Sequence, residues 1–383
     1  MRIALVGCGY VADFYLNTLP NHPELEIAAV TDRDAERTRR FASHYGVRAA
    51  ESLEEILEDP SIELVVNLTN PASHYAVSRA ALESGKHVYS EKPLAMEMAE
   101  ATTLVERAEK LGLRIASAPC NVLGETAQTV WKALREEKIG RVRLVYAEQD
   151  NGFLHRLPYR TWRSESGTPW PWKDEFEVGC TLEHAGYYLT WLAAFFGPAR
   201  SVTSFASILV PDKECDAPLA VESPDFSVAC IEFDSGVVAR LSCSIVAPRD
   251  HTLRVFGDEG VLSTPNCWDY ASPVYLKQRT PLHLRAEKYP RAAKLMGLGP
   301  RAQTPVRKPR FRYQSKGAER MDFARGIAEL AASVREGRPC RLSARFCLHV
   351  NELALAIQNP DNFGTPHTLR STFDPIEPMS WAT

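Results

Sequence analysis

The sequence predicts two domains, a doubly wound parallel α/β domain at the N-terminus and a following α+β domain with a largely antiparallel sheet. The chain has 383 residues, more than one hydrophobic core usually organises. Short apolar runs alternate with helical patterns through the first third, and the pattern becomes rich in β-strand after about residue 140. We therefore expect domains at residues 1–120 and 121–383.

Five short apolar runs predict the strands of the first domain. Helices cover both faces of a parallel sheet, so its strands read as nearly continuous apolar runs, as residues 64–68 do. A long helical pattern at residues 97–111 ends at Gly112. The predicted strands are residues 3–6, 27–30, 64–68, 87–89 and 115–117.

The second domain combines strand patterns with helices. Asp234-Ser235-Gly236 is a tight turn between two predicted strands. Helical patterns occupy residues 127–137, 321–336 and 346–358, whereas residues 277–316 have no sustained periodicity and are expected to form an inserted loop. The predicted strands are residues 141–148, 201–209, 226–233, 237–246 and 252–256.

Composition excludes several classes of protein. The chain is 45% hydrophobic and 24% charged with a formal charge of −3, as in ordinary globular proteins. No run approaches the roughly 18 to 20 apolar residues needed to cross a bilayer, and no secretory signal is recognisable. The nine cysteines are scattered without a Cys-x-x-Cys pair, so neither a disulfide framework nor a metal site is expected. We expect a cytoplasmic protein that neither spans nor binds a membrane.

A glycine-rich loop follows the first predicted strand and opens a helix. Gly7-Cys8-Gly9-Tyr10-Val11-Ala12 has the spacing Gly-x-Gly-x-x-Ala, which in this context binds a dinucleotide. The glycines allow the backbone to approach a pyrophosphate, which then faces the positive end of the helix. The candidate cofactor contacts in this loop are Gly7, Gly9, Tyr10, Val11 and Ala12.

Asp32, at the end of the second predicted strand, is the candidate acid for the ribose hydroxyls. A 2′-phosphate about 4 Å from it would meet a repulsion on the order of 4 kcal/mol at an effective dielectric near 20, so NAD is favoured over NADP. Arg33 weakens this preference because its guanidinium could bind a 2′-phosphate. The alternative is that Asp32 caps the helix that begins at Ala35.

Catalytic candidates lie in the segment Gly85-Lys86-His87-Val88-Tyr89-Ser90-Glu91-Lys92-Pro93. A hydride leaves an alcohol carbon only as the hydroxyl proton departs, so a basic or hydrogen-bonding group must lie at that oxygen. Lys92 can fill this role, and burial is expected to lower its pKa. Glu91 would orient Lys92 or contact the nicotinamide. The alternative for Lys92 is a surface lysine after a strand.

Together with the glycine loop, Asp32 and the segment Thr69-Asn70-Pro71-Ala72-Ser73-His74, this segment resembles the Gfo/Idh/MocA family. That family couples a Rossmann domain to an open-faced β-sheet domain and oxidises or reduces sugars, inositols and related polyols. The resemblance covers nearly the whole chain. It implies NAD, a sugar-like small-molecule substrate and a homodimer or homotetramer, and it adds Thr69, Asn70, Pro71 and His74 to the candidate cofactor contacts.

The resemblance also identifies a second proton-handling segment, at residues 179–188. The family motif is Asp-x-Gly-x-His; aligned on Gly186, His184 takes the Asp position and Tyr188 the His position. The tyrosine resembles the glucose-fructose oxidoreductase and dihydrodiol dehydrogenase branch, whose acid is a tyrosine paired with the motif lysine, whereas His184 departs from both branches.

On a regular helix, residues four apart share a face, so His184 and Tyr188 could both face the cleft. A lysine ammonium can lower the pKa of a phenol. We therefore predict Lys92 and Tyr188 as the catalytic pair, with His184 orienting the substrate or sharing proton transfer. The alternatives are a packed Tyr188 and a hydrogen-bonded core His184.

Other candidates rest on weaker correspondences. Trp162-Arg163 resembles the Trp-Arg pair that precedes this helix in relatives, and Asn121 falls where a polar residue contacts the nicotinamide or substrate. The loop before this pair is a usual place for substrate selection and offers donors for hydroxyls or a carboxylate. Its candidate substrate contacts are His155, Tyr159 and Arg160.

Residues 277–316 are strongly basic, with twelve Lys and Arg side chains against one acid, Glu287. This excess favours an anionic partner, such as the pyrophosphate of a nucleotide sugar, a phosphorylated substrate or an acidic surface of a neighbouring subunit. A solvated loop is the alternative. No nucleic-acid-binding motif accompanies the charge, so no such partner is expected.

The motifs together predict an NAD(P)-dependent dehydrogenase or reductase that acts on CH–OH groups. Two alternatives stay open. One is a redox-assisted lyase or glycosidase that recycles its NAD internally, as relatives in the family do. The other is a dinucleotide-sensing regulator that has lost catalysis.

Overall fold

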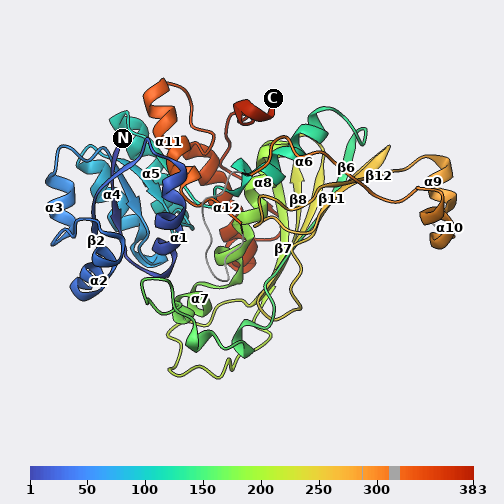
Figure 1. Cartoon of the computed structure of the whole chain (residues 1–383). Helices are drawn as coiled ribbons and strands as arrows, with labels where there is room; N and C mark the ends of the chain where they lie inside the picture. Colours follow the sequence, from blue (N-terminus) through green and yellow to red (C-terminus); the bar gives the residue numbers. More distant parts are fainter. Residues whose placement is uncertain (287, 310–319) are drawn as a thin grey trace.

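Two β-sheets organise the computed structural model, which describes residues 1–286, 288–309 and 320–383 (Figure 1). The predicted doubly wound domain and the predicted antiparallel domain are both confirmed. Four charged residues of the basic segment, Glu287, Arg310, Arg312 and Lys316, lie outside the described residues.

The first sheet is parallel, with strand order β2-β1-β3-β4-β5. All four residues of β3 are buried, because helices cover both faces of the sheet. The order reverses direction at β1, and ligands of such sheets bind beyond the carboxyl ends of the strands at this point. The strands are β1 (Arg2–Val6), β2 (Glu26–Thr31), β3 (Leu64–Asn67), β4 (His87–Ser90) and β5 (Ile115–Ser117).

Helices of the first domain begin and end at residues suited to those positions. The carboxylate of Asp34 accepts hydrogen bonds from the backbone N–H groups of Glu36 and Arg37 and so caps α2, which ends at Gly46 in a left-handed conformation. The helices are α1 (Tyr10–Thr18), α2 (Ala35–Tyr45), α3 (Leu53–Glu58), α4 (His74–Glu83) and α5 (Met98–Leu111).

The second sheet has nine strands in the order β13-β12-β11-β10-β6-β9-β8-β7-β14. Among the strands that the structure describes in this sheet, only β6 and β9 pair in parallel. Along β8, Ala229, Ile231 and Phe233 are buried while Cys230 and Glu232 are exposed, so one face is covered and the other is open. The strands are β6 (Val142–Asp150), β7 (Ala199–Ser207), β8 (Phe226–Phe233), β9 (Val238–Ser244), β10 (Leu253–Gly257), β11 (Gly260–Thr264), β12 (Tyr275–Gln278), β13 (Arg301–Ala302) and β14 (His367–Thr368).

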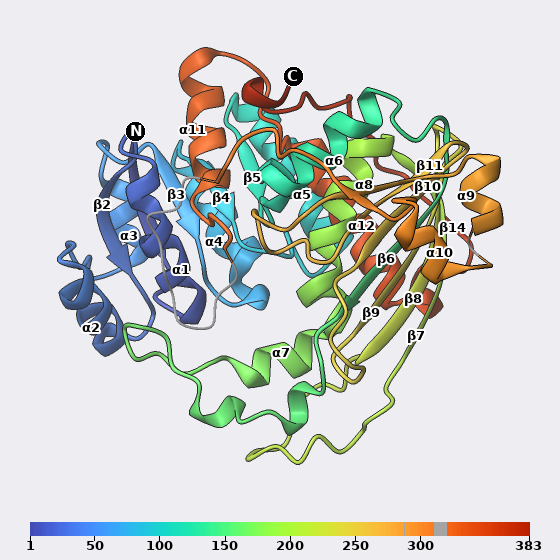
Figure 2. The same ribbon diagram turned by 45° about the vertical axis from the view of Figure 1, so that its right-hand side comes forward.

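Helices between the two sheets join the domains (Figure 2). α12 (Ala344–Gln358) contacts β7 of the second sheet as well as α5 and β5 of the first, and α11 (Arg325–Glu336) contacts β4. A Cβ atom at Gly326 would lie 2.2 Å from the Tyr89 hydroxyl, so only glycine permits this approach. The remaining helices are α6 (Glu125–Arg135), α7 (Trp172–Val178), α8 (Gly186–Phe196), α9 (Pro281–Ala286), α10 (Pro290–Leu295) and α13 (Pro360–Phe363).

Several shorter helical turns complete the described fold. Residues Thr181–Ala185 form a π-helical turn that leads directly into α8. The 3₁₀ turns are Leu19–Asn21, Pro71–Ser73, Asn121–Leu123, Leu154–Arg156, Tyr159–Thr161 and Ser380–Ala382. Over the described residues, no helix has the length and apolar character needed to span a bilayer.

The basic segment was expected to be a loop, but part of it is helical. α9 and α10 follow β12 and project from the end of the second sheet that is farthest from the first domain (Figure 1). Each helix starts at a proline, Pro281 or Pro290, a residue favoured at the first helical position. Neither is long enough to show the helical periodicity on which sequence prediction depends.

Candidate active site

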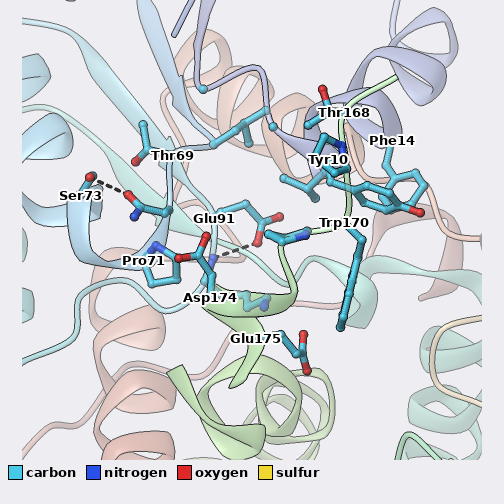
Figure 3. A pocket seen from close by; sticks show the side chains of 18 of the residues that line it. Tyr10, Phe14, Thr69, Pro71, Ser73, Glu91, Thr168, Trp170, Asp174 and Glu175 are labelled. Atoms are coloured by element: carbon cyan, nitrogen blue, oxygen red, sulfur yellow. Dashed lines mark hydrogen bonds between the residues drawn. The ribbon is translucent and has the colours of Figure 1, made fainter. Parts of the chain in front are cut away.

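A cavity of about 1750 Å³ lies beyond the carboxyl ends of the parallel strands, and residues 151–187, Arg249 and Trp268 of the second domain bound its other side (Figure 3). Pockets for single small ligands measure about 300–1,000 Å³, so this one can hold a dinucleotide and a substrate together. The predicted residues that line it are Gly7, Gly9, Tyr10, Val11, Asp32, Arg33, Thr69, Asn70, Pro71, His74, Glu91, Lys92, Trp162, Arg163 and His184.

The glycine loop fits a dinucleotide. A Cβ atom at Gly7, whose φ is +101°, would lie 2.4 Å from the carbonyl oxygen of Leu68, so this turn requires glycine. Gly9 immediately precedes α1 and provides no side-chain cap, and nothing lies within 4 Å of the position that a Cβ atom on Gly9 would take, which leaves open space before the helix. The first N–H groups of α1 can therefore face a pyrophosphate. Ala12 is buried beneath the loop and does not line the cavity.

Asp32 lines the cavity directly after the end of β2. Its Oδ2 accepts a hydrogen bond from the Cys8 N–H at 2.9 Å, and its Oδ1 accepts one from the Asp34 N–H at 2.9 Å. Asp34, not Asp32, caps α2. The guanidinium of Arg37 is 3.3 Å from Asp32 Oδ1, and Arg33 and Arg37 line the same cavity. The Asp32 carboxylate could accept hydrogen bonds from ribose hydroxyls. The guanidinium groups of Arg33 and Arg37 could instead bind a 2′-phosphate.

His74 links the two cavity segments that carry the resemblance to the family. Its Nδ1 is 2.7 Å from the carbonyl oxygen of Pro93, and its Nε2 is 3.0 Å from that of Thr69. Burial lowers the pKa of His74, against the raising effect of these carbonyls. A neutral imidazole ring can donate only one of these two hydrogen bonds. The contacts of the ring hold the segment Glu91-Lys92-Pro93 beside the segment that begins at Thr69.

Lys92 forms an ion pair with Glu183 of the second domain. Glu91 accepts a hydrogen bond from the Tyr15 hydroxyl at 2.7 Å and another from the Lys92 backbone N–H at 3.0 Å. Burial acts to lower the pKa of Lys92, but the carboxylates of Glu183, Glu91 and Glu175 outweigh it and leave the pKa raised. The expected lowering of this pKa is therefore wrong, and Lys92 is a cation at neutral pH.

His184 and Glu175 form a second pair in the same cavity. His184 Nε2 lies 2.6 Å from Glu175 Oε1, and both side chains are largely buried. Burial acts to raise the pKa of Glu175, but the adjacent imidazole and the Lys92 ammonium hold it below its ordinary value. The other ring nitrogen, Nδ1, has no hydrogen-bond partner among the described residues. Glu175 comes from α7, which the sequence did not predict (Figure 3).

Tyr188 does not reach Lys92. Its side chain is fully buried, its hydroxyl donates a hydrogen bond to the carbonyl oxygen of His251, and its ring packs on Trp191 at 5.7 Å. Burial raises the pKa of Tyr188 well above its ordinary value. The π-helical turn before α8 shifts the helix register, so Tyr187 lines the cavity in place of Tyr188.

Four other predicted residues lie outside the cavity lining. Asn121 is buried and donates hydrogen bonds to the carbonyl oxygens of Tyr187 and Cys267. Tyr159 is buried against Trp170, and Arg160 pairs with Asp216 at 2.7 Å on the surface. His155 is partly buried but also contributes nothing to the lining. No described residue of 277–309 lines the cavity.

Aromatic side chains line the side of the cavity that faces the second domain, and of the tryptophans among them only Trp162 had been selected from the sequence. Four of the seven tryptophans of the chain line the cavity. Trp268 packs on Tyr187 with ring centroids 5.1 Å apart, and Trp162 packs on Trp170 at 5.2 Å. Glu183 was also missed, although its place beside His184 in the second motif could have indicated it. The aromatic rings provide flat apolar surfaces for a ring-shaped substrate.

Residues 164–168 form a strap that docks on the glycine loop and α1. Asp13 accepts hydrogen bonds from the N–H of Ser166 at 2.7 Å and from its hydroxyl at 2.9 Å. Arg40 donates to the carbonyl oxygen of Ser166 at 3.0 Å, and the Thr168 hydroxyl is 3.5 Å from the carbonyl oxygen of Cys8. The strap therefore lies beside the glycine loop at the edge of the cavity.

Comparisons with known proteins agree with this architecture. Residues 1–118 match the family model described as an oxidoreductase family with an NAD-binding Rossmann fold, and residues 127–263 match the GFO/IDH/MocA C-terminal domain. The chain is 25% identical over 272 residues to trans-1,2-dihydrobenzene-1,2-diol dehydrogenase of Mus musculus, covering 70% of this chain and 75% of that protein.

Two solved structures share the fold at low sequence identity. The aldose-aldose oxidoreductase from Caulobacter crescentus has a TM-score of 0.74 and 17% identity, with 96% of this chain and 99% of that chain covered. The WlbA dehydrogenase from Bordetella pertussis, solved in complex with NADH and UDP-GlcNAcA, has a TM-score of 0.70 and 18% identity, with 98% of each chain covered.

Proposed function

The chain belongs to the Gfo/Idh/MocA family of oxidoreductases, and we propose that it transfers a hydride between a nicotinamide dinucleotide and a hydroxyl- or keto-bearing carbon of a sugar, nucleotide sugar or polyol. One observation carries this proposal: Lys92, at the end of β4, lines the cofactor cavity and pairs with Glu183 of the second domain. Residues 1–120 would hold the cofactor and residues 121–383 the substrate. NAD is the proposed cofactor, with NADP second.

The residues of the first domain suit the two ends of the cofactor. The loop at Gly7 and Gly9 holds the pyrophosphate, and Asp32 accepts the ribose hydroxyls. Thr69, Asn70 and Pro71 form the wall that leads from there to Lys92. When bound, NAD supplies the hydride acceptor for oxidation, or NADH the donor for reduction.

Proton transfer falls to His184 and Lys92. During oxidation, Nδ1 of His184 accepts the hydroxyl proton, and the ionised Glu175 on the opposite ring nitrogen stabilises the imidazolium that forms. The Lys92 ammonium donates a hydrogen bond to the same substrate oxygen and stabilises its developing negative charge. Reduction runs through the same groups in reverse. Tyr188 has a packing role in this scheme, which replaces the predicted lysine–tyrosine pair.

The substrate proposal draws support from the relatives and from the aromatic lining. The mouse relative is named for a cyclic diol, and one structural neighbour is named for aldoses. Trp268, Tyr187 and Trp170 offer apolar faces to a ring, while Lys92 and His184 address its hydroxyl. We also propose a cytoplasmic homodimer or homotetramer that acts on a small molecule, as the family resemblance implies.

A redox-assisted lyase or glycosidase is the second candidate. Simple oxidation of an alcohol needs one proton acceptor, yet the cavity holds two acid–base pairs, Lys92–Glu183 and His184–Glu175. The second pair could abstract a C–H proton acidified by a transient ketone, after which elimination occurs and the hydride returns. Such an enzyme would turn over without a net change in NADH.

The proposal is tested by titrating nucleotide-free protein with NAD and NADP in a calorimeter and then screening aldoses, uronic acids, nucleotide sugars and cyclic diols for NADH formation. Preferential NAD binding with NADH formation from a polyol is the expected result. Substrate conversion without net NADH would favour the lyase, and failure of folded protein to bind either dinucleotide would overturn the proposal.

A further inference from the structure

Three side chains of the second domain line one corner of the cavity, and their polar groups have no role in the proposed reaction. Asn151 follows β6, Arg249 lies between β9 and β10, and Trp268 follows β11. β6, β9 and β11 run in the same direction, because β6 pairs in parallel with β9 and β10 lies antiparallel between β6 and β11. The strand ends therefore bring the three residues to one edge of the second sheet.

His251 holds this corner together. Its Nε2 lies 2.8 Å from Asn151 Oδ1, and its ring centroid lies 4.4 Å from that of Trp268. The Arg249 Cζ is 5.8 Å from the centroid of the Trp268 ring. Burial, and then the nearby Arg249 guanidinium, lower the pKa of His251 to about 3. The three side chains therefore surround an imidazole that is neutral at neutral pH.

These side chains present hydrogen-bond donors to a ligand. The Asn151 Oδ1 can only accept, so His251 Nε2 donates to it, and the amide nitrogen Nδ2 has no partner among the described residues. The buried Trp268 Nε1, which can only donate, also has no partner in the described part of the chain. Arg249 adds guanidinium N–H groups and a positive charge. A buried donor without a partner destabilises the protein, so we expect a ligand acceptor to satisfy these groups.

The corner adjoins the groups that we assign to the substrate hydroxyl. The ring centroids of Trp268 and His184 are 6.0 Å apart. Two acids of the same wall are already engaged, Glu175 with His184 and Glu183 with Lys92. A group bound in the corner and the reacting hydroxyl can therefore belong to one sugar ring.

We infer that Arg249, Asn151 and Trp268 form a subsite for a carboxylate, and that the substrate of this protein is a sugar acid. A carboxylate has only acceptor oxygens and suits a corner of donors, whereas a hydroxyl also needs an acceptor for its proton. Arg249 is exposed although it lines the cavity, so it can meet the charge first, and the two buried nitrogens then fix the orientation. The inference rests on the proposed function for the hydroxyl chemistry, whereas binding of the acid stands without it.

Matched pairs of neutral sugars and sugar acids test the inference through NADH formation. The pairs are D-glucose with D-glucuronate, D-galactose with D-galacturonate, and UDP-glucose with UDP-glucuronate. For the acid of at least one pair, the wild-type kcat/KM is expected to be about 10- to 100-fold higher than for the neutral sugar. Glucose 6-phosphate is the control for an anion that has no carboxylate.

The Arg249→Met substitution tests the charged member of the subsite. It keeps the length of the side chain and removes its charge, so the acid-to-neutral ratio of kcat/KM should fall by about tenfold or more. A general loss of activity leaves this ratio unchanged, because both substrates are measured on the same variant. Arg156→Met, at an exposed arginine that does not line the cavity, is the matched control.

Two further substitutions test the neutral donors. Asn151→Asp keeps the shape of the side chain and puts a like charge against the carboxylate, so the ratio should fall at least as far as in Arg249→Met. Trp268→Phe keeps an aromatic ring without its N–H, and the ratio should fall by about three- to tenfold. A thermal unfolding midpoint close to that of the wild type shows that each variant is folded.

Calorimetric titration of the full chain with the same sugars separates this inference from the proposed function, because binding needs no turnover. The titration is made with and without saturating NADH. Binding of a sugar acid that Arg249→Met weakens by about tenfold supports the subsite even where no NADH forms. In that case only the proposed function fails.

Three results would overturn the inference. The first is a wild type that binds no acid more tightly than its neutral partner. The second is a preference for the acid that persists unchanged in Arg249→Met. The third is tighter binding of glucose 6-phosphate than of glucuronate, which would make the corner a phosphate site.

Discussion

Replacing Glu175 by glutamine should slow catalysis without weakening cofactor binding. Glu175 lies 2.6 Å from His184 Nε2 in a largely buried pair. Glu175→Gln keeps the size of the side chain and removes the charge that stabilises the imidazolium. A hydrogen bond to a charged group contributes about 1.5–3 kcal/mol. If that stabilisation is lost only in the transition state, kcat should fall roughly 10- to 150-fold with little change in KM.

The pH dependence of kcat in the wild type should also show that the ionised form of Glu175 supports catalysis. The His184 imidazole holds the pKa of Glu175 below its ordinary value, although burial opposes this shift. The carboxylate is then ionised at neutral pH, and its support of His184 is lost only as the pH falls through that lowered pKa. The contribution of the pair to folding stability should follow the same sign, present at neutral pH and lost in acid.

The assay is steady-state kinetics with a substrate from the screen, accompanied by calorimetric titration with NAD. Glu177→Gln is the matched control, because Glu177 lies on the same helix, accepts a hydrogen bond from the Ala220 N–H at 2.6 Å and does not line the cavity. A Glu175→Gln enzyme within about twofold of the wild-type kcat would refute the role of Glu175. An equal loss in the Glu177→Gln control would show a general effect of α7 instead.

Further substitutions test the other assignments. Lys92→Met should reduce kcat by about 10²- to 10⁴-fold while NAD still binds. Tyr188→Phe should lower the free energy of unfolding by about 1–3 kcal/mol in a denaturant titration, because the buried carbonyl of His251 loses its hydrogen-bond donor. Tyr188→Phe should leave kcat nearly unchanged, and a large loss of kcat would restore Tyr188 as the catalytic acid. Arg40→Ala removes a hydrogen bond to the carbonyl oxygen of Ser166 in the strap. The rate of NADH release, measured by stopped flow, should therefore increase several-fold. An unchanged rate would mean that the strap does not retain the cofactor. Asp32→Ala should weaken NAD binding far more than NADP binding, as measured by calorimetry, and equal losses would remove Asp32 from the ribose site.

Prediction from the sequence succeeded where local chemistry determines structure. The five strands of the first sheet and the glycine loop at Gly7 and Gly9 follow from short apolar runs and from a turn that only glycine can make. The same holds for most strands of the second sheet, in which apolar and polar residues alternate because only one face of the sheet is covered. Lys92 was selected from its motif, and the structure places it in the cavity.

The second half of the candidate site depended on contacts that no local pattern encodes. Lys92 and Glu183 are 91 residues apart, and their pairing arises only when the two domains close around the cavity. The spacing argument for Tyr188 assumed a regular α-helix, but one π-helical turn at Thr181–Ala185 changed which tyrosine faces the cleft. The choice of proton-handling group therefore changed although its segment had been located correctly.

The sequence alone located the candidate cofactor contacts, because the glycine loop, Asp32 and Lys92 each depend on a few consecutive residues and on the strand that precedes them. Tertiary structure decided the rest of the candidate site. The charge state of Lys92, the pairing of His184 with Glu175, the aromatic lining and the strap at Ser166 all join segments distant in the chain. Their energies come from burial and from charges brought within a few ångströms, which only the folded chain produces.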